Sequence, residues 1–152
     1  MNYKLAIIGH GNYPDGVKSA LKLFTGDDSA FDVFNLDDKT THAAFQAELS
    51  QYLAKNERVI IMADMTGGAP HQEVAELLLK AGRPYQYIVS SAPLNLILDL
   101  YMQDVTGMLT DATVKDVLTH SVQQAAESIR ITPTLNTPVS VGGHDQVEED
   151  GI

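Results

Sequence analysis

The sequence predicts an α/β fold: a doubly wound, mostly parallel sheet with strand order 2-1-3-4 and helices on both faces. Two observations predict it. Short apolar runs alternate with longer segments of helical periodicity through four strand-helix units, and the 152 residues suffice for one domain with a substantial core. Right-handed crossovers leave few other topologies for such alternation, so we expect the strands to lie parallel between two helical layers.

Four segments have the composition of strands. Tyr3–Gly9 (YKLAIIG) and Arg58–Asp64 (RVIIMAD) are nearly continuous apolar runs, which is typical of strands covered on both faces. Phe31–Leu36 (FDVFNL) and Tyr85–Ser90 (YQYIVS) carry the same signal more weakly. The two strong runs are therefore expected at the centre of the sheet.

Helical periodicity of the apolar residues predicts the segments between and after the strands. The expected helices span Pro14–Phe24, Thr41–Lys55, Pro70–Ala81, Pro93–Met102 and Thr113–Ile129. Pro14 and Pro70 occupy first-turn positions, and Gly26 and Gly82 follow the last turns of the same two helices. Proline at the start and glycine just past the end are typical helix boundaries.

A short strand is expected after the last helix. Ile129–Leu135 (IRITPTL) alternates apolar and polar residues, and Pro133 and Pro138 suit an edge position. We therefore expect an added edge strand. The chain then divides into a domain of residues 1–135 and a C-terminal tail of residues 136–152.

Composition and charge exclude several classes of partner. With 10 Lys and Arg against 20 Asp and Glu, the formal net charge is −10, which opposes nonspecific binding to nucleic acid or to an anionic membrane. The absence of cysteine excludes disulfides and thiolate chemistry. No apolar run has the length of a membrane span, and MNYKLAIIGHG lacks the cleavage site of a signal peptide, so we expect a cytoplasmic protein.

The candidate site lies where the two strong strands end. His10 follows the first strand, between two glycines, and Asp64 ends the third. In the order 2-1-3-4 these strands are neighbours about 4.8 Å apart, and ligand sites open at their carboxyl ends. We therefore expect His10 to face Asp64.

Such a pair is suited to phosphoryl transfer. A carboxylate that accepts a hydrogen bond from Nδ1–H fixes the tautomer and leaves Nε2 as a free nucleophile. MTGGAPHQEV (Met65–Val74) follows at once and leads into a helix N-terminus, where free N–H groups and the helix dipole favour an anion. The catalytic candidates are His10 and Asp64, and the candidate phosphate-binding residues are Gly11, Met65, Thr66, Gly67 and Gly68.

Each element also has a simpler interpretation. A lone histidine in a loop is usually just a polar residue on the surface, Asp64 is suited to cap the next helix, and Gly67-Gly68 is suited to a plain turn. The five histidines form no compact metal motif, so neither a metal nor a cofactor is expected. His71 lies close enough to the phosphate-binding candidates to keep in view.

Taken together, the motifs resemble the IIA component of mannose-type (mannose/fructose/sorbose) sugar phosphotransferase systems. The resemblance covers roughly Lys4–Ile131 and rests on AIIGHG with His10, GVKSALKLFTG, VIIMADMTGGAPHQEVAELLL and PLNLILDL. It implies that His10 accepts a phosphoryl group from the phosphocarrier protein HPr and passes it to a IIB component, while Asp64 orients the histidine. It also implies a homodimer in which Ile129–Leu135 pairs antiparallel with the partner's sheet, and membrane contact only through the IIC and IID components.

The sequence departs from the family pattern near the site. The family commonly has Asp-Thr-x-Gly-Gly-Ser-Pro, whereas Met65 and Ala69 stand here at the two hydroxyl positions. Whether Thr66 replaces those hydroxyls is open. The family's Gly-x-Asn-x-Pro-Met segment is represented by SSAPLNL (Ser90–Leu96), with the order of Asn and Pro altered.

Three alternatives remain. A receiver domain of the two-component type would be phosphorylated on Asp64, but it needs an acidic pair where this chain has GHG. A dinucleotide-binding domain would use Asp37 or Asp38 after the second strand, but Pro14 stands at the third glycine position of its Gly-x-Gly-x-x-Gly motif. The third keeps the IIA resemblance and makes the protein a regulatory or kinase-donor phosphoprotein.

Overall fold

The computed structural model describes residues 3–27 and 29–135. The elements are β1 (Lys4–His10), α1 (Tyr13–Thr25), β2 (Asp32–Leu36), α2 (His42–Lys55), β3 (Val59–Ala63), α3 (Ala69–Ala81), β4 (Gln86–Val89), α4 (Leu94–Val105) and α5 (Val114–Glu127). All four predicted strands and all five predicted helices are present, with ends shifted by at most a few residues.

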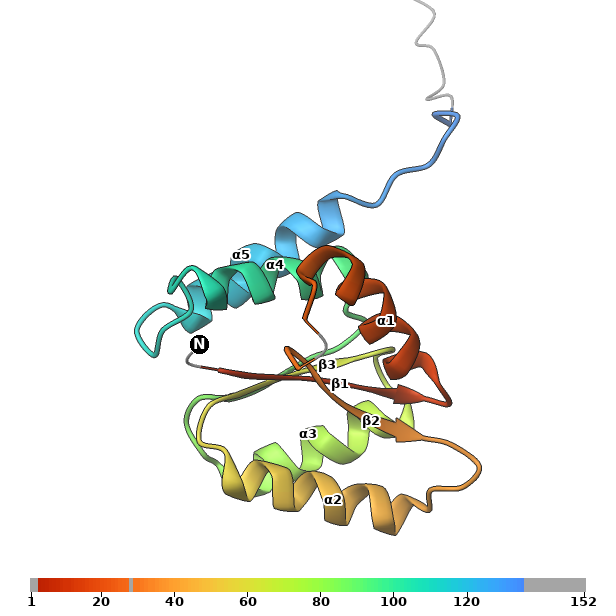
Figure 1. Ribbon diagram of the computed structural model, residues 1–152, viewed down its shortest axis with the longest axis vertical. Helices are drawn as coiled ribbons and strands as arrows, with labels where there is room; N and C mark the ends of the chain where they lie inside the picture. The colour runs from red at the N-terminus through yellow and green to blue at the C-terminus, as the bar shows by residue number, and fades with distance from the viewer. Residues whose placement is uncertain (1–2, 28, 136–152) are drawn as a thin grey trace, which may run out of the picture.

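The molecule has three layers. The strands form one parallel sheet in the order β2-β1-β3-β4. Helices α1, α4 and α5 cover one face of the sheet and α2 and α3 the other (Figure 1). The predicted strand order and the helices on both faces are therefore confirmed.

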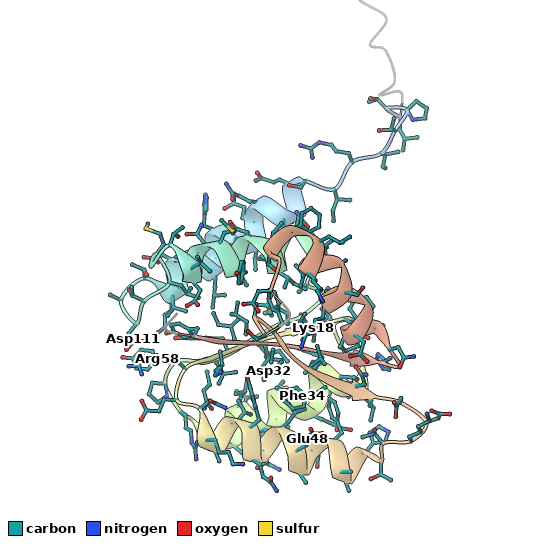
Figure 2. All side chains as sticks on the ribbon, viewed as in Figure 1. Lys18, Asp32, Phe34, Glu48, Arg58 and Asp111 are labelled. Atoms are coloured by element: carbon teal, nitrogen blue, oxygen red, sulfur yellow. The ribbon has the colours of Figure 1, made fainter. Side chains whose placement is uncertain are left out.

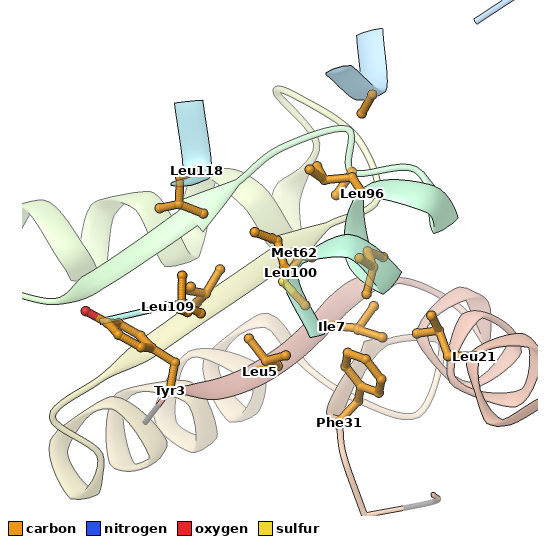
Figure 3. Close-up of a cluster of buried hydrophobic side chains, with 14 of the residues drawn as sticks. Tyr3, Leu5, Ile7, Leu21, Phe31, Met62, Leu96, Leu100, Leu109 and Leu118 are labelled. Atoms are coloured by element: carbon orange, nitrogen blue, oxygen red, sulfur yellow. The ribbon is translucent and has the colours of Figure 1, made fainter. Parts of the chain in front are cut away.

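The apolar runs of the two central strands are buried on both faces. Successive side chains of a strand point to opposite faces, so β1 supplies Leu5 and Ile7 to one core and Ala6 and Ile8 to the other. Figure 3 shows the first core, in which Ile7 lies among side chains of β3, α1 and α4. Phe45 anchors the second core beneath α2.

The helix boundaries follow the expected chemistry. Pro14 and Pro70 lie in the first turns of α1 and α3. Gly26 and Gly82 end these helices in the left-handed conformation, with φ of 69° and 57°. Thr41 caps α2 by accepting the N–H of Ala44 at 3.1 Å.

A charged cluster closes the amino end of the sheet. Arg58 donates two hydrogen bonds to Asp111, Nε to Oδ1 at 2.7 Å and Nη2 to Oδ2 at 2.6 Å, and the Tyr3 hydroxyl donates to the same carboxylate at 3.2 Å. Figure 2 shows Arg58 and Asp111 together at the edge where β1 begins. The hydrogen bond and charge of Arg58 lower the pKa of Asp111, so the pair stays ionised and ties the loop before α5 to the sheet.

The segment after α5 differs from the expected edge strand. Residues 129–135 form no strand and pair with no strand of their own chain. They run away from the body (Figure 1), with Ile129, Ile131 and Leu135 exposed. The predicted tail, residues 136–152, lies outside the described residues, and no helix of the described part is long and apolar enough to cross a membrane.

Truncation of Phe45 tests the packing of the second core. Phe45 is 1% exposed, so Phe45→Ala removes a full ring from a packed interior and should lower the free energy of unfolding by about 3–5 kcal/mol. Urea unfolding followed by circular dichroism measures the change. Leu79→Ala, at an 84% exposed position of α3, is the control and should change stability by less than about 0.5 kcal/mol. Equal effects of the two variants would contradict this packing.

Candidate functional site

The site lies at the carboxyl edge of the sheet, where β1 and β3 end side by side. Ile8 is opposite Ala63 in the register of the two strands, and Asp64 N–H donates to the Ile8 carbonyl at 3.2 Å. His10 is the last residue of β1 rather than the first residue of a loop. Parallel pairing of β1 and β3 therefore fixes the backbone positions of His10 and Asp64 relative to each other.

His10 and Asp64 are joined by two hydrogen bonds to one oxygen. Asp64 Oδ2 lies 2.7 Å from His10 Nδ1 and accepts the backbone N–H of His10 at 2.8 Å. Since an ionised carboxylate can only accept, the ring proton is on Nδ1 and Nε2 carries a lone pair. The Asp64 side chain is 11% exposed and that of His10 46%, so the buried acid orients a ring that faces solvent.

The surroundings keep Asp64 ionised. Partial burial raises the pKa of its carboxyl, but hydrogen bonds from the backbone and ring of His10 outweigh burial, helped by the Met65 N–H, which donates to Oδ1 at 2.8 Å. The pKa of Asp64 is therefore lowered below its usual 3.8. Its contribution to stability is present above the ordinary pKa and is lost as the pH falls through the lowered one.

Gly9 makes room for this carboxylate. A Cβ at Gly9 would lie 2.9 Å from both Cγ and Oδ2 of Asp64, closer than real Cβ contacts. The glycine before the histidine thus leaves space for the Asp64 carboxylate. Gly11, on the other side, has φ of 56°, a left-handed turn that starts the loop into α1.

The loop between β3 and α3 packs against the ring of His10. A Cβ at Gly68 would lie 2.7 Å from His10 Cε1, 3.5 Å from Nε2 and 2.9 Å from Met65 Cγ. Gly68 is also the N-cap of α3, so Asp64 does not cap this helix. The first-turn N–H groups of α3, which have no partner within the helix, start close to Nε2 of His10.

Other N–H groups of the same loop are already bonded to side chains. Thr66 N–H donates to Ser91 Oγ at 3.0 Å, and Gly67 N–H donates to His71 Nδ1 at 3.2 Å. Among the predicted phosphate-binding residues, Gly68 lies against His10, whereas the amides of Met65, Thr66 and Gly67 have internal acceptors. Ser91 and His71 thus hold the backbone of the loop; His71 had a signal in its closeness to the glycine pair, and Ser91 lies in the SSAPLNL segment, which gave no sign of this contact.

Comparison with known proteins identifies the family of the chain. Residues 4–118 match the family model described as "PTS system fructose IIA component". The chain belongs to this family. A search against curated protein sequences gives no match.

Solved structures of IIA proteins share the fold. Component EIIA from Streptococcus agalactiae has a TM-score of 0.75 at 19% identity, covering 85% of this chain and 96% of its own. The mannose/sorbose-specific IIA subunit from Enterococcus faecalis has a TM-score of 0.71 at 17% identity, covering 90% and 100%. The IIA protein associated with the fucose utilization operon from Streptococcus pneumoniae has a TM-score of 0.70 at 20% identity, covering 86% and 93%.

In this IIA domain, three hydroxyl groups form a cluster beside the glycine loop. Thr66 Oγ1 lies 2.7 Å from Ser90 Oγ and 2.8 Å from Ser91 Oγ. This cluster joins the loop after β3 to the segment after β4. The Thr66 hydroxyl is held within that cluster.

The electrostatics of the IIA site favour an anion over the ring. Helices α1, α2, α3 and α4 each follow a parallel strand, so their positive ends gather at the carboxyl edge. Partial burial, and then the charge of Asp64, raise the pKa of the nearby Tyr13 hydroxyl, so this group stays a neutral donor at neutral pH. The described residues form no group of three His, Asp or Glu side chains able to hold a metal ion.

The variant Gly9→Ala tests the tightness of the His10–Asp64 contact. Its methyl group would overlap the Asp64 carboxylate, so we expect the hydrogen bond to Nδ1 to weaken and the neutral ring to become a mixture of tautomers. Nitrogen-15 NMR of the imidazole measures the tautomer ratio. Gly16→Ala is the control: its Cβ meets nothing within 4 Å on α1, so the ring signals should stay unchanged while stability rises by about 0.5–1 kcal/mol. Identical ring spectra for Gly9→Ala and the unaltered protein would contradict the close contact.

Proposed function

We propose that this IIA protein accepts a phosphoryl group from HPr on Nε2 of His10 and passes it to a IIB component during sugar uptake. The observation that carries the proposal is the 2.7 Å contact of His10 Nδ1 with Asp64, which turns Nε2 outward as a free nucleophile. In this role the protein works in the cytoplasm and meets the membrane only through the IIC and IID components.

Each side chain has one task in the transfer. The Nε2 lone pair attacks the phosphorus of phospho-HPr, the new P–N bond forms as the bond to the HPr histidine breaks, and the HPr ring leaves as neutral imidazole. The His10 ring gains positive charge as the bond forms, and Asp64, already bonded to Nδ1–H, stabilises that charge. In the transfer to IIB, the acceptor group of IIB attacks the phosphorus, the P–N bond to His10 breaks, and the His10 ring leaves as neutral imidazole.

The start of α3 supports the charge on the phosphoryl oxygens. Gly68 lies against Cε1 and near Nε2, so a group on Nε2 sits beside the first turn of α3. The N–H groups at the start of α3 that lack a partner within the helix, and the positive end of the helix dipole, stabilise an anion there. Of the proposed phosphate-binding residues, Gly68 has the strongest geometric support.

Labelling tests the identity of the acceptor. Incubation with phosphoenolpyruvate, enzyme I and HPr should give an acid-labile, alkali-stable phosphoramidate that His10→Ala abolishes. His42→Ala is the matched control, because His42 also pairs its Nδ1 with a carboxylate, that of Glu73, and should leave labelling intact. Persistent labelling of His10→Ala rejects the assignment, and an adduct lost in mild alkali indicates an acyl phosphate on Asp64, as in a receiver domain.

The role of the acid is tested by Asp64→Asn. The amide keeps the shape but cannot stabilise a developing imidazolium, so transfer should slow by up to about 10⁴-fold while the protein stays folded. Rapid-quench measurement of transfer from phospho-HPr gives the rate. Asp116→Asn, an exposed first-turn position of α5, should transfer normally. Unchanged transfer in Asp64→Asn would show that the two residues do not cooperate.

The same assay separates transport from regulation. If phospho-His10 transfers to a IIB protein, the uptake role is supported. If His10 is phosphorylated but no IIB protein accepts the group, the regulatory or kinase-donor alternative is favoured.

We also propose a homodimer built by exchange of residues 129–135. The sheet leaves β4 as an open edge, and beside it lies an apolar hollow of about 180 Å³ whose lining includes Val89, Leu96 and Val122. The exposed apolar residues Ile129 and Ile131 run out of the body nearby. Antiparallel pairing of this segment with β4 of a second copy covers both surfaces.

Sedimentation equilibrium tests the dimer. The full chain should be dimeric at micromolar concentration, and a chain ending at Ser128 should be monomeric. Ile131→Asp in the full chain is a second variant that should weaken the dimer, because it charges an apolar side chain of the exchanged segment. A monomeric full chain rules out the exchange.

A further inference from the structure

The end of β4 contains one residue more than a regular ladder needs. Val59 N–H bonds to the Tyr85 carbonyl at 3.0 Å, and this register would bring the N–H of residue 91 to the Ala63 carbonyl. Instead, the N–H of Ala92 donates to the Ala63 carbonyl at 3.1 Å. One residue is therefore inserted, and Ser91 takes up the excess with φ of 51°.

This backbone is unusual for serine. Left-handed φ is strained for residues that have a Cβ, whereas glycine adopts it freely. Ser91 is one of two non-glycine residues with positive φ in the described part of the chain, and the other, Tyr85, immediately precedes β4. Strain of this kind gathers at functional sites. The side chain of Ser91 is therefore the feature to explain.

The inserted residue aims a hydroxyl at the loop that carries the site. Ser91 Oγ accepts Thr66 N–H at 3.0 Å and lies 2.8 Å from Thr66 Oγ1, which in turn donates to Ser90 Oγ at 2.7 Å. Since Thr66 Oγ1 gives its proton to Ser90, Ser91 donates to Thr66. Ser90 thus contacts only the Thr66 side chain, while Ser91 also holds the Thr66 backbone.

That backbone bond acts on His10 through two residues. Thr66 lies midway between Asp64, which orients the ring, and Gly68, whose Cβ position is 2.7 Å from His10 Cε1. His71 holds the next amide, Gly67 N–H, from the α3 side. A loop fixed from both sides keeps Gly68 against the ring.

We propose that Ser91 is a positioning residue: its hydroxyl, placed by the extra residue at the end of β4, holds the Asp64–Gly68 loop so that His10 keeps Nε2 in line for transfer. The proposal rests on the proposed function for its kinetic consequence, but the geometric part concerns the ring alone. A misplacement on the scale of 1 Å lowers the rate of an oriented transfer by about 100-fold.

Ser91→Gly is the decisive variant, because it removes the hydroxyl and relieves the backbone at the same time. It should be at least as stable as the unaltered protein in urea, yet transfer from phospho-HPr should slow by roughly 10- to 100-fold in kcat with KM unchanged. Nitrogen-15 NMR should show a less uniform tautomer at His10, and Thr66 N–H should exchange faster with solvent. Ser91→Ala, which also lacks the hydroxyl, should transfer as slowly.

Two further variants separate positioning from general packing. Ser90→Ala removes a neighbouring hydroxyl that touches no backbone N–H of the loop and should transfer at the normal rate. Asparagine tolerates left-handed φ, and its side-chain carbonyl oxygen can accept Thr66 N–H. Ser91→Asn should therefore transfer faster than Ser91→Ala, at close to the normal rate.

The outcomes distinguish this proposal from the proposed function. If the unaltered protein is not phosphorylated by HPr, the proposed function fails and the NMR measurements alone decide the role of Ser91. If Ser91→Gly and Ser91→Ala keep both the normal rate and the normal His10 spectrum, the positioning role is overturned. Equal slowing by Ser90→Ala would also overturn it, because the effect would then belong to the whole hydroxyl cluster.

Discussion

The hydrogen bond between Asp64 and the ring of His10 is the constraint on which the rest of the site depends. It requires two adjacent parallel strands ending at matched heights, a glycine where the carboxylate crosses β1, and a loop that turns back over the ring. Each requirement is met by a different part of the fold: the β1–β3 register, Gly9, and the Asp64–Gly68 segment. The arrangement of strands thus determines which nitrogen of the ring faces solvent.

The hydrogen bonds of Asp64 already hold the His10 ring with Nε2 toward solvent. One carboxylate oxygen takes both the ring and the backbone N–H of His10, and the other takes Met65 N–H. Since three donors hold Asp64, rotation of the acid would break several hydrogen bonds at once. In the transfer proposed for His10, such preorganisation would lower the free energy needed to reach the transition state, because the developing charge would meet groups already in position.

Much of this architecture could be predicted from the sequence, because it depends on local patterns. The apolar runs of β1 and β3, the prolines and glycines at the ends of α1 and α3, and the switch point between the strands all follow from periodicity and helix-end chemistry. The contributions of Gly9 and Ser91 could not be predicted, because each depends on contact between segments far apart in the chain. The extra residue at Ser91 changes the register by one position, which leaves no trace in composition. The exchanged strand, for its part, concerns a second copy and stays a prediction.

The cluster of Arg58, Asp111 and Tyr3 lies at the opposite end of the sheet from His10. The central residues of β1 and all residues of β3 are buried between the two ends, and the hydrogen bonds of one cluster involve no residue of the other. Energetic effects at distant sites without common partners add independently. Substitutions around Arg58 are therefore expected to change the stability of the protein without changing the transfer rate proposed for His10. Because the two clusters are separate, the stability of the fold can vary without a change at the His10 site.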